Sequence, residues 1–467
     1  MFGSPLTHQL LRVLSAMALL LAGPMIQAEE PLHLPETVFP ELESILKQME
    51  DESPEMLIHR ARVQAAEANE KAQLSPKWPK IHLNLQMTNR SEFRDSNPTY
   101  QNTTQPFGIA RLEQDLYHWG ALDAQRDIGQ FQKAISENNY AETYRLLTLR
   151  VRTLYLRLLF TREQIAYYRA ESERYMQSLE RSEQQAESGR ITQDQLENDH
   201  LALEEANIQL ERTTSEAEML EEDLRLATGW QGPIDGPTQG LLQRFTELEQ
   251  EEASMAAEVI SSSAPPSLAY KNKEQELKIA EAQYVRIRAQ NMPLLDFVTE
   301  AYQDQIASQG QDNIDRTVVA VYLRVNWNIF DGFKTKWDKI QSKAQQRALK
   351  LQAEHIAQKD KLEVDRLRRD RKLIERDINL WERRVALSEN QVKRVQAERE
   401  KNTATESDLI AAENTLLADR LTLVNYRLSL FTNSTELLSI FGDDPFGAPK
   451  HSLEEPVQDV YDEDFYW

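Results

Sequence analysis

The chain has 467 residues, of which 28% are charged and 40% hydrophobic, with only 14 glycines and a net charge of −22 at pH 7. This glycine-poor, charge-rich composition favours long amphipathic helices over a large mixed core. The negative charge argues against nucleic acid as a partner, because phosphate backbones select basic surfaces. The chain contains no cysteine, which excludes disulfides, thiolate metal sites and a lipidated cysteine.

Residues 1–28 have the organisation of a secretory signal peptide. Arg12 supplies a positive charge, an apolar run from Val13 to Ala22 follows, and Ala28 ends a small-residue cleavage motif before Glu29. The apolar run is far shorter than the about 20 residues that a transmembrane helix needs. We therefore expect this segment to be cleaved. No later segment is apolar enough for a transmembrane helix, so any membrane crossing would have to use strands.

The rest of the chain contains an internal repeat, with an offset of about 213 residues between its two halves. Five landmarks recur in order at nearly this offset, among them Leu196 with Leu409 and Gly229 with Gly442. Each half also contains a long proline-free stretch. Proline in a helix interior costs about 3 kcal/mol, so these stretches can form very long helices. The pattern predicts a duplicated structural unit.

The first repeat, residues 29–240, predicts a helix, two strands and two long helices. In its first strand the apolar residues Ile81, Leu83 and Leu85 alternate with polar ones, so one face would be apolar and the other polar. The polar stretch between the two strands is expected to be a loop. The expected elements are a helix at about 55–74, strands at about 79–90 and 105–117, and long helices at about 120–187 and 192–228.

The second repeat, residues 241–442, predicts the same order. Its second strand alternates most clearly, from Val319 to Ile329. The acidic residues 443–467 are expected to form a largely disordered tail. The expected strands lie at about 293–304 and 317–330, and the long helices at about 333–400 and 405–441.

Four strands cannot close a barrel, which takes about eight. An open sheet in lipid would leave unpaired edges that cost several kcal/mol per polar group. The sheet therefore either lies outside a membrane or is shared by several copies. The signal peptide, the alternating strands, the polar hairpin tips and the aromatic residues Trp78 and Trp327 near strand ends favour a shared barrel with lipid outside and water inside.

The repeat, the strand-to-helix junctions LYHWG (116–120) and IFDGF (329–333), and the helical turns GRITQDQL and NTATESDL resemble the TolC family of outer-membrane efflux and secretion proteins. The resemblance covers about residues 42–442. It implies a mainly α fold with a membrane β-barrel portion, in which four strands per chain form a trimeric 12-stranded β-barrel that continues as a long α-helical barrel. The family's junctions usually read Phe-Asp-Gly-Gly, from which both junctions here depart.

The same resemblance implies a homotrimer in the outer membrane of a Gram-negative bacterium, with its helical tunnel in the periplasm. Its partners would be outer-membrane lipid, a periplasmic adaptor protein and an inner-membrane transporter of the ABC or RND type. The complex would be a tripartite efflux pump or a type I secretion system. The transported substrate, whether drug, metal ion or protein, is left open.

The resemblance also assigns roles to particular residues. Asp408 corresponds to an acidic ring at the family's periplasmic constriction. The family's second acidic position is Ala411 here, and Glu406 and Glu413 are possible substitutes. The alternative is that Asp408 merely begins a helix, where an acidic residue suits the dipole. The bends at the membrane boundary are expected at Tyr117, Trp119 and Gly120 and at Phe330, Asp331 and Gly332, and the adaptor is expected to dock at Gly189, Arg190, Ile191 and Thr192 and at Asn402, Thr403, Ala404 and Thr405.

No catalytic constellation is recognisable. The eight histidines are scattered without a pair at metal-ligand spacing, and there is no phosphate-binding glycine loop or nucleophile elbow. We therefore expect no enzymatic activity, no cofactor and no metal. The alternative from another functional class is a periplasmic coiled-coil scaffold without a pore.

Overall fold

The structure is a computed structural model. The predicted signal peptide lies outside the described residues, as does the tail beyond residue 449. The structure describes residues 34–94, 97–234, 265–306, 314–401, 403–441 and 446–449, together with 236, 241 and 444.

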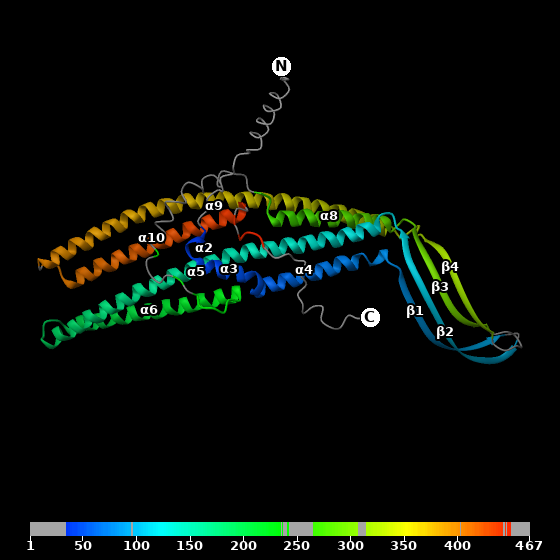
Figure 1. The fold of residues 1–467 in the computed structure, drawn as a ribbon, viewed down its shortest axis with the longest axis horizontal. Coiled ribbons are helices and arrows are strands. Elements are labelled where there is room, and N and C mark those ends of the chain that lie inside the picture. The colour runs from blue at the N-terminus through cyan, green and yellow to red at the C-terminus, as the bar shows by residue number, and fades with distance from the viewer. Residues whose placement is uncertain are drawn as a thin grey trace, which may run out of the picture.

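The order of elements repeats as the sequence predicts: a helix, two strands and two long helices occur twice (Figure 1). Two shorter helices precede the first repeat, α2 (Pro35–Val38) and α3 (Pro40–Glu52). The first repeat consists of α4 (Pro54–Gln73), β1 (Lys80–Arg94), β2 (Asn97–Tyr117), α5 (Ala121–Glu187) and α6 (Gln193–Thr228). The second consists of α8 (Leu268–Ala289), β3 (Leu294–Ile306), β4 (Ile314–Asn326), α9 (Lys334–Glu400) and α10 (Glu406–Phe441).

The long helices have matching lengths in the two repeats. α5 and α9 each have 67 residues, and α6 and α10 each have 36. At 1.5 Å per residue, the longer pair extends about 100 Å. α6 ends at Gly229, whose left-handed φ of 73° stops the helix.

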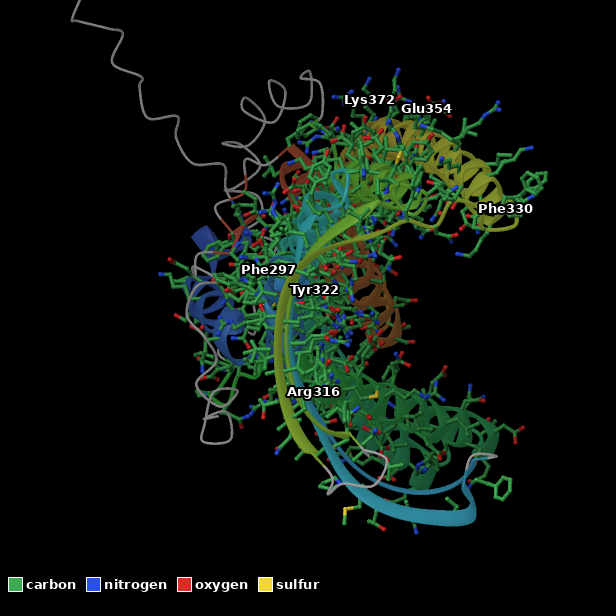
Figure 2. All side chains as sticks on the ribbon, turned by 90° about the vertical axis from the view of Figure 1, so that its right-hand side faces the viewer. Phe297, Arg316, Tyr322, Phe330, Glu354 and Lys372 are labelled. Atoms are coloured by element: carbon green, nitrogen blue, oxygen red, sulfur yellow. The ribbon has the colours of Figure 1, made fainter. Side chains whose placement is uncertain are left out.

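The helices lie side by side in a single curved layer. Towards the helical tips the order across the layer is α9, α10, α5, α6, and towards the strands it is α4, α5, α8, α9. Seen along the long axis, the sheet and the helices form an open arc (Figure 2). The chain therefore forms a segment of a wall.

The strands form one antiparallel sheet in the order β1-β2-β3-β4. β1 and β4 are consequently its two edges. The register sets Leu83 beside Ala110, Ala110 beside Ala301, and Ala301 beside Val319. One face is therefore apolar across all four strands.

Several strand boundaries differ from those predicted. The polar stretch expected to be a loop is strand, because β1 continues to Arg94 and β2 starts at Asn97. Its Thr, Asn and Gln side chains do not alternate in polarity, but the backbone ladder continues through them. The last strand, expected to reach residue 330, ends at Asn326, where the chain turns towards α9 and the Trp327 indole donates to the Asn291 carbonyl over 3.1 Å.

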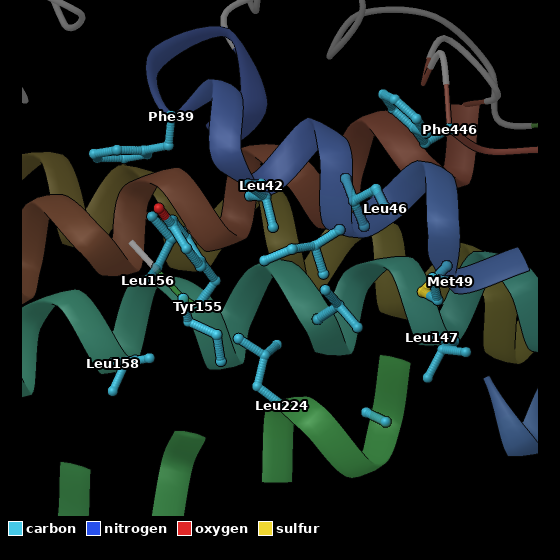
Figure 3. Close-up of a cluster of buried hydrophobic side chains, with 14 of the residues drawn as sticks. Phe39, Leu42, Leu46, Met49, Leu147, Tyr155, Leu156, Leu158, Leu224 and Phe446 are labelled. Carbon is cyan, nitrogen blue, oxygen red and sulfur yellow. The ribbon is translucent and has the colours of Figure 1, made fainter. Parts of the chain in front are cut away.

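The main core lies at mid-length, where α3 covers the middle of α5 (Figure 3). We call it the equatorial cluster; it includes Phe39, Leu42, Leu46, Met49, Leu147, Tyr155, Leu156, Leu224 and Phe446.

Arg152 is buried beside this cluster, with 1% of its surface exposed. It donates to Glu36 over 3.0 Å and to Asp444 over 2.8 Å. Burial raises the pKa of the Glu36 carboxyl above its ordinary value, against the attraction of Arg152. The ion pairs thus join the segments at both ends of the described chain to the centre of α5.

Candidate functional site

The apolar face of the sheet is exposed on both edge strands. On β1, Ile81 and Met87 are 74% and 75% exposed, and on β4, Val319 and Val325 are 68% and 64% exposed. In each strand the apolar positions span seven residues, about 20 Å at 3.3 Å per residue. This height is close to the about 25 Å apolar band of membrane barrels.

The opposite face carries charged side chains that link three strands. Arg324 on β4 donates to Asp296 on β3 over 2.9 Å and to Glu113 on β2 over 2.6 Å. Arg111 pairs with Glu300 at 2.7 Å. The alternation of the strands predicts this polar face, and the alternation of charges along them could have suggested the network, which was not among the predictions.

Both strand-to-helix junctions turn through two consecutive left-handed residues. They are Trp119 and Gly120 in the first junction, with φ of 49° and 81°, and Gly332 and Phe333 in the second, both with φ of 68°. The glycine and the aromatic residue have exchanged places between repeats. The bend therefore has the same form in both, although neither junction has the family's pair of glycines.

The junctions are held by hydrogen bonds to neighbouring segments. The Trp119 indole donates to the Pro293 carbonyl over 2.9 Å. The Thr335 amide donates to the Asp331 carboxylate over 2.8 Å, and this bond and one from the Thr335 hydroxyl hold the pKa of Asp331 below its ordinary value. Tyr117 ends β2 and contacts the Trp119 ring, while Phe330 contacts Phe333.

A cavity of about 330 Å³ opens at the first junction, between the end of β2 and the start of α5. Lys77, Asp115, His118 and Asp123 contribute to its lining. Lys77 pairs with Asp123 at 2.6 Å and holds the pKa of that carboxyl below its ordinary value. No local motif in the sequence marks this cavity, because its lining comes from segments that meet only at the bend.

The first predicted docking turn is compact and capped. Gly189 has a φ of 68°, with open space beyond it. Thr192 then begins α6: its hydroxyl accepts from the Gln195 amide while the Gln195 side chain accepts from the Thr192 amide. Arg190 and Ile191 lie between these two features in a turn that projects from the end of the hairpin.

The second predicted docking turn resembles the first. Thr403 bonds to the Glu398 carbonyl through its amide and its hydroxyl, over 2.9 and 2.8 Å. Ala404 and Thr405 follow it in the turn. Asn402 and the side chain of Glu406 lie outside what the structure describes.

Asp408 is exposed at this second tip and caps α10. Its carboxylate accepts from the Thr405 amide over 2.8 Å and from the Thr405 hydroxyl over 2.6 Å. These bonds hold its pKa below the ordinary value, so the group stays ionised. Glu413, a suggested substitute, instead pairs with Arg174 on α5 at 3.2 Å. The helix-starting role is therefore seen directly, and the acidic constriction stays a prediction that requires several copies.

Within the described residues, no cluster of three or more His, Asp or Glu side chains is placed to hold a metal ion. No helix in the described part of the chain is long and apolar enough to cross a membrane.

Comparison with known proteins shows similarities in sequence and in fold. Residues 45–230 match the family model of the outer membrane efflux proteins. No curated protein sequence matches the chain significantly.

Three solved structures share the fold over most of the chain. The CmeC outer membrane channel of Campylobacter jejuni has a TM-score of 0.72 at 10% identity, covering 92% of each chain. The outer membrane protein VceC of Vibrio cholerae has a TM-score of 0.67 at 14% identity, covering 88% of this chain and 98% of its own. The open state of the MtrE outer membrane channel of Neisseria gonorrhoeae has a TM-score of 0.65 at 14% identity, covering 86% and 89%.

Proposed function

Because this chain belongs to the TolC family of bacterial outer-membrane efflux proteins, we propose that it is a trimeric outer-membrane channel-tunnel. It would serve as the passive exit duct of a tripartite efflux pump or a type I secretion system. Its strands would lie in the outer membrane and its long helices in the periplasm. The channel would conduct substrates passively, and an inner-membrane transporter of the ABC or RND type would supply the driving force.

The observation that carries this proposal is the open sheet with one apolar face. Among the described residues its edge strands β1 and β4 each pair with one strand, and its apolar face is exposed over about the height of a membrane band. In lipid those edges must be paired. Pairing β4 of one copy with β1 of the next closes a ring of three copies, which turns the polar face towards a water-filled lumen.

The helical turns at the opposite end support a role in docking. The two hairpins α5–α6 and α9–α10 project their tips, with Gly189 to Thr192 at one and Thr403 to Thr405 at the other, beyond the rest of the helical layer. We propose these turns, together with Asn402, as the contact sites for the helical hairpin of a periplasmic adaptor. Adaptor docking would open the tunnel.

Asp408 would form the constriction. Three copies of an exposed carboxylate around one axis give a negative ring that attracts multivalent cations. The hydrogen bonds from Thr405 hold the pKa of Asp408 below its ordinary value of 3.8. The carboxylate cap therefore stabilises the turn above pH 3.8, and that contribution is lost only as the pH falls through the still lower folded-state value.

The Asp408 prediction is tested by channel block. Block by a trivalent cation should be nearly constant between about pH 5 and pH 7, because the ring remains ionised in this range. Asp408→Asn should weaken the block about tenfold or more. Asp419→Asn, at a buried site on α10 further from the tip, should leave the block unchanged. Equal block in the wild type and Asp408→Asn would remove Asp408 from the constriction.

The function itself is tested by purification and conductance. The full chain should fractionate with outer membranes, require detergent for extraction, have the mass of three chains, and give single-channel currents in a planar bilayer. A monomer that is soluble without detergent and shows no conductance would contradict the channel. That outcome would favour the periplasmic coiled-coil scaffold.

A further inference from the structure

The row of helices near the tips ends in two helices that each have one neighbouring helix there among the described residues. There α9 packs on α10, and α6 packs on α5. Both edge helices expose several large apolar side chains, whereas of the two helices in the middle of the row α10 exposes none among its described side chains and α5 exposes two, Leu146 and Met176. On α9, from residue 362 towards the tip, the exposed large apolar residues are Leu362, Leu373, Leu380 and Leu387, and on α6 they are Leu201, Ile208, Met219 and Leu226.

The exposed leucines of α9 follow a regular pattern with arginine. An exposed arginine precedes an exposed leucine by four residues, and this unit recurs every seven residues. Positions i and i+4 are neighbours on one helix face. The three units are Arg369 with Leu373, Arg376 with Leu380, and Arg383 with Leu387.

α6 carries units of the same kind with the opposite charge, although only the first two of them are seven residues apart. An exposed glutamate precedes an exposed apolar residue by four residues in Glu197 with Leu201, Glu204 with Ile208, and Glu222 with Leu226. Two further exposed glutamates, Glu211 and Glu218, continue the seven-residue spacing from Glu204. Within the described part of the chain, these glutamates and the three arginines form no ion pair.

The total charges of the two edge helices are also opposite. α6 contains eleven acidic and two basic residues, whereas α9 contains nineteen basic and twelve acidic residues. The charges of the two helices would repel other copies of the same helix and attract the other helix. The charge pattern thus favours one occupant for each exposed face, the opposite edge of a second copy.

The directions of these faces fit a closed ring. At about 100° per residue, the apolar stripe of each edge helix lies about 140° from the face that packs within the chain. In a closed ring of twelve helices, four from each of three copies, the directions from one helix to its two neighbours would form an angle of about 150°, measured on the side that faces the ring axis. Around each helix, the longer of the two arcs between the apolar stripe and the face that packs within the chain would point away from the ring axis. The charged residues lie on this longer arc, next to the stripe, and would therefore face outwards.

The level of each residue along the long axis follows from the duplication. On α9, Ser388 hydrogen-bonds to Asp419 of α10. Because α10 and α6 have equal length and start 213 residues apart, position 419 corresponds to Ala206 on α6. α9 and α6 run in opposite directions, so Leu387 is level with about Ile208. By the same count Arg383 is level with Glu211, and Arg376 with Glu218.

We propose that α9 of one copy packs antiparallel against α6 of the next copy, with Leu387 against Ile208. Arg383 pairs with Glu211 and Arg376 with Glu218 along the outer surface of this seam. The inference rests on the proposed trimer and specifies which helices meet, in which direction and in which register.

The register is tested by cross-linking, for which a chain without cysteine is well suited. Ile208→Cys combined with Leu387→Cys should give a covalent trimer when oxidised in outer membranes and run on a non-reducing gel. Leu226→Cys combined with Leu387→Cys is the matched control, because Leu226 lies about 27 Å from Ile208 along α6. The first pair should cross-link at least tenfold more than the second. Equal yields, or none with the first pair, would overturn the register.

The charge pairing is tested by reversal and restoration. Arg376→Glu with Arg383→Glu should speed trimer dissociation in detergent about tenfold. Adding Glu211→Arg with Glu218→Arg should return the dissociation rate to that of the wild type. Lys350→Glu with Lys359→Glu is the control; it changes the same charge on the same helix, beyond the level of α6. Failure of the restoring pair would overturn the charge pairing.

The two proposals can fail separately. If the wild-type chain is a conducting trimer but the Ile208–Leu387 pair does not cross-link, the seam is wrong and the channel stands. If the wild-type chain is a monomer without conductance, both fail.

Discussion

The equatorial cluster and the β-sheet differ in whether their apolar side chains are covered within one chain. In the equatorial cluster, α3 covers the middle of α5 and the side chains are almost completely buried within one chain. In the sheet, the apolar face and both edges are left uncovered. The difference teaches that a single chain covers its apolar side chains at its centre but not in its sheet, whose apolar face and edges would be covered by lipid and neighbouring copies in the proposed trimer.

The largest effect is expected at the buried ion pairs. Arg152→Ala leaves Glu36 and Asp444 buried without their partner, which should cost about 3–5 kcal/mol. Arg157→Ala is the control on the same helix, because its pair with Glu216 is exposed and worth at most about 1 kcal/mol. Denaturant titration of the purified protein measures both. Similar losses would mean that the centre is no more self-sufficient than the rest.

The sheet should respond to charge on only one face. Leu85→Arg places a charge on the face assigned to lipid, which should cost about 2–4 kcal/mol near the membrane midplane. Gln86→Arg, one residue further on, places the same charge on the polar face and should cost little. The two variants are compared by unfolding in lipid vesicles. Equal tolerance would argue that neither face meets lipid.

Two left-handed glycines provide a third contrast, between centre and tip. At Gly229 a Cβ would overlap the backbone carbonyl of Glu52, whereas at Gly189 it would meet open space. Gly229→Ala should therefore cost about 2–4 kcal/mol, from overlap and the left-handed conformation together. Gly189→Ala should cost only about 1 kcal/mol, from the conformation alone. Thermal unfolding of the two variants side by side gives the difference, and a larger loss at Gly189 would contradict it.

The same contrast explains what could be predicted from the sequence. The long helices were placed within about a residue, because the left-handed Gly229 and long proline-free stretches mark their extent locally. The strand ends were less accurate, because the polar residues 89–105 join a ladder whose continuation depends on the partner strand. The Arg152 ion pairs could not be found, since Glu36 and Asp444 are 116 and 292 residues away from it.

The candidate sites divide in the same way. The junction and tip motifs are local in the sequence, and their described residues lie at bends and turns of the chain, while their roles as sites stay predictions. Whether Asp408 lines a constriction depends on copies of the chain that one sequence does not position. The alternating charges of α6 and α9 are visible in the sequence, but their meaning depends on knowing that these helices are the edges of the layer.

The smallest expected effect concerns the second junction, where Phe333 has a left-handed φ of 68°. A residue with a Cβ pays roughly 1 kcal/mol for this conformation, and glycine does not. Phe333→Gly should therefore be about 1 kcal/mol more stable than Phe333→Ala, since both variants lose the contact of the ring with Phe330. At Gln341, an exposed site within α9, the order should reverse, because alanine favours a helix interior over glycine by about 1 kcal/mol. Unfolding midpoints of these four variants decide the matter. The same order at both positions would show that the bend does not depend on a left-handed residue at 333.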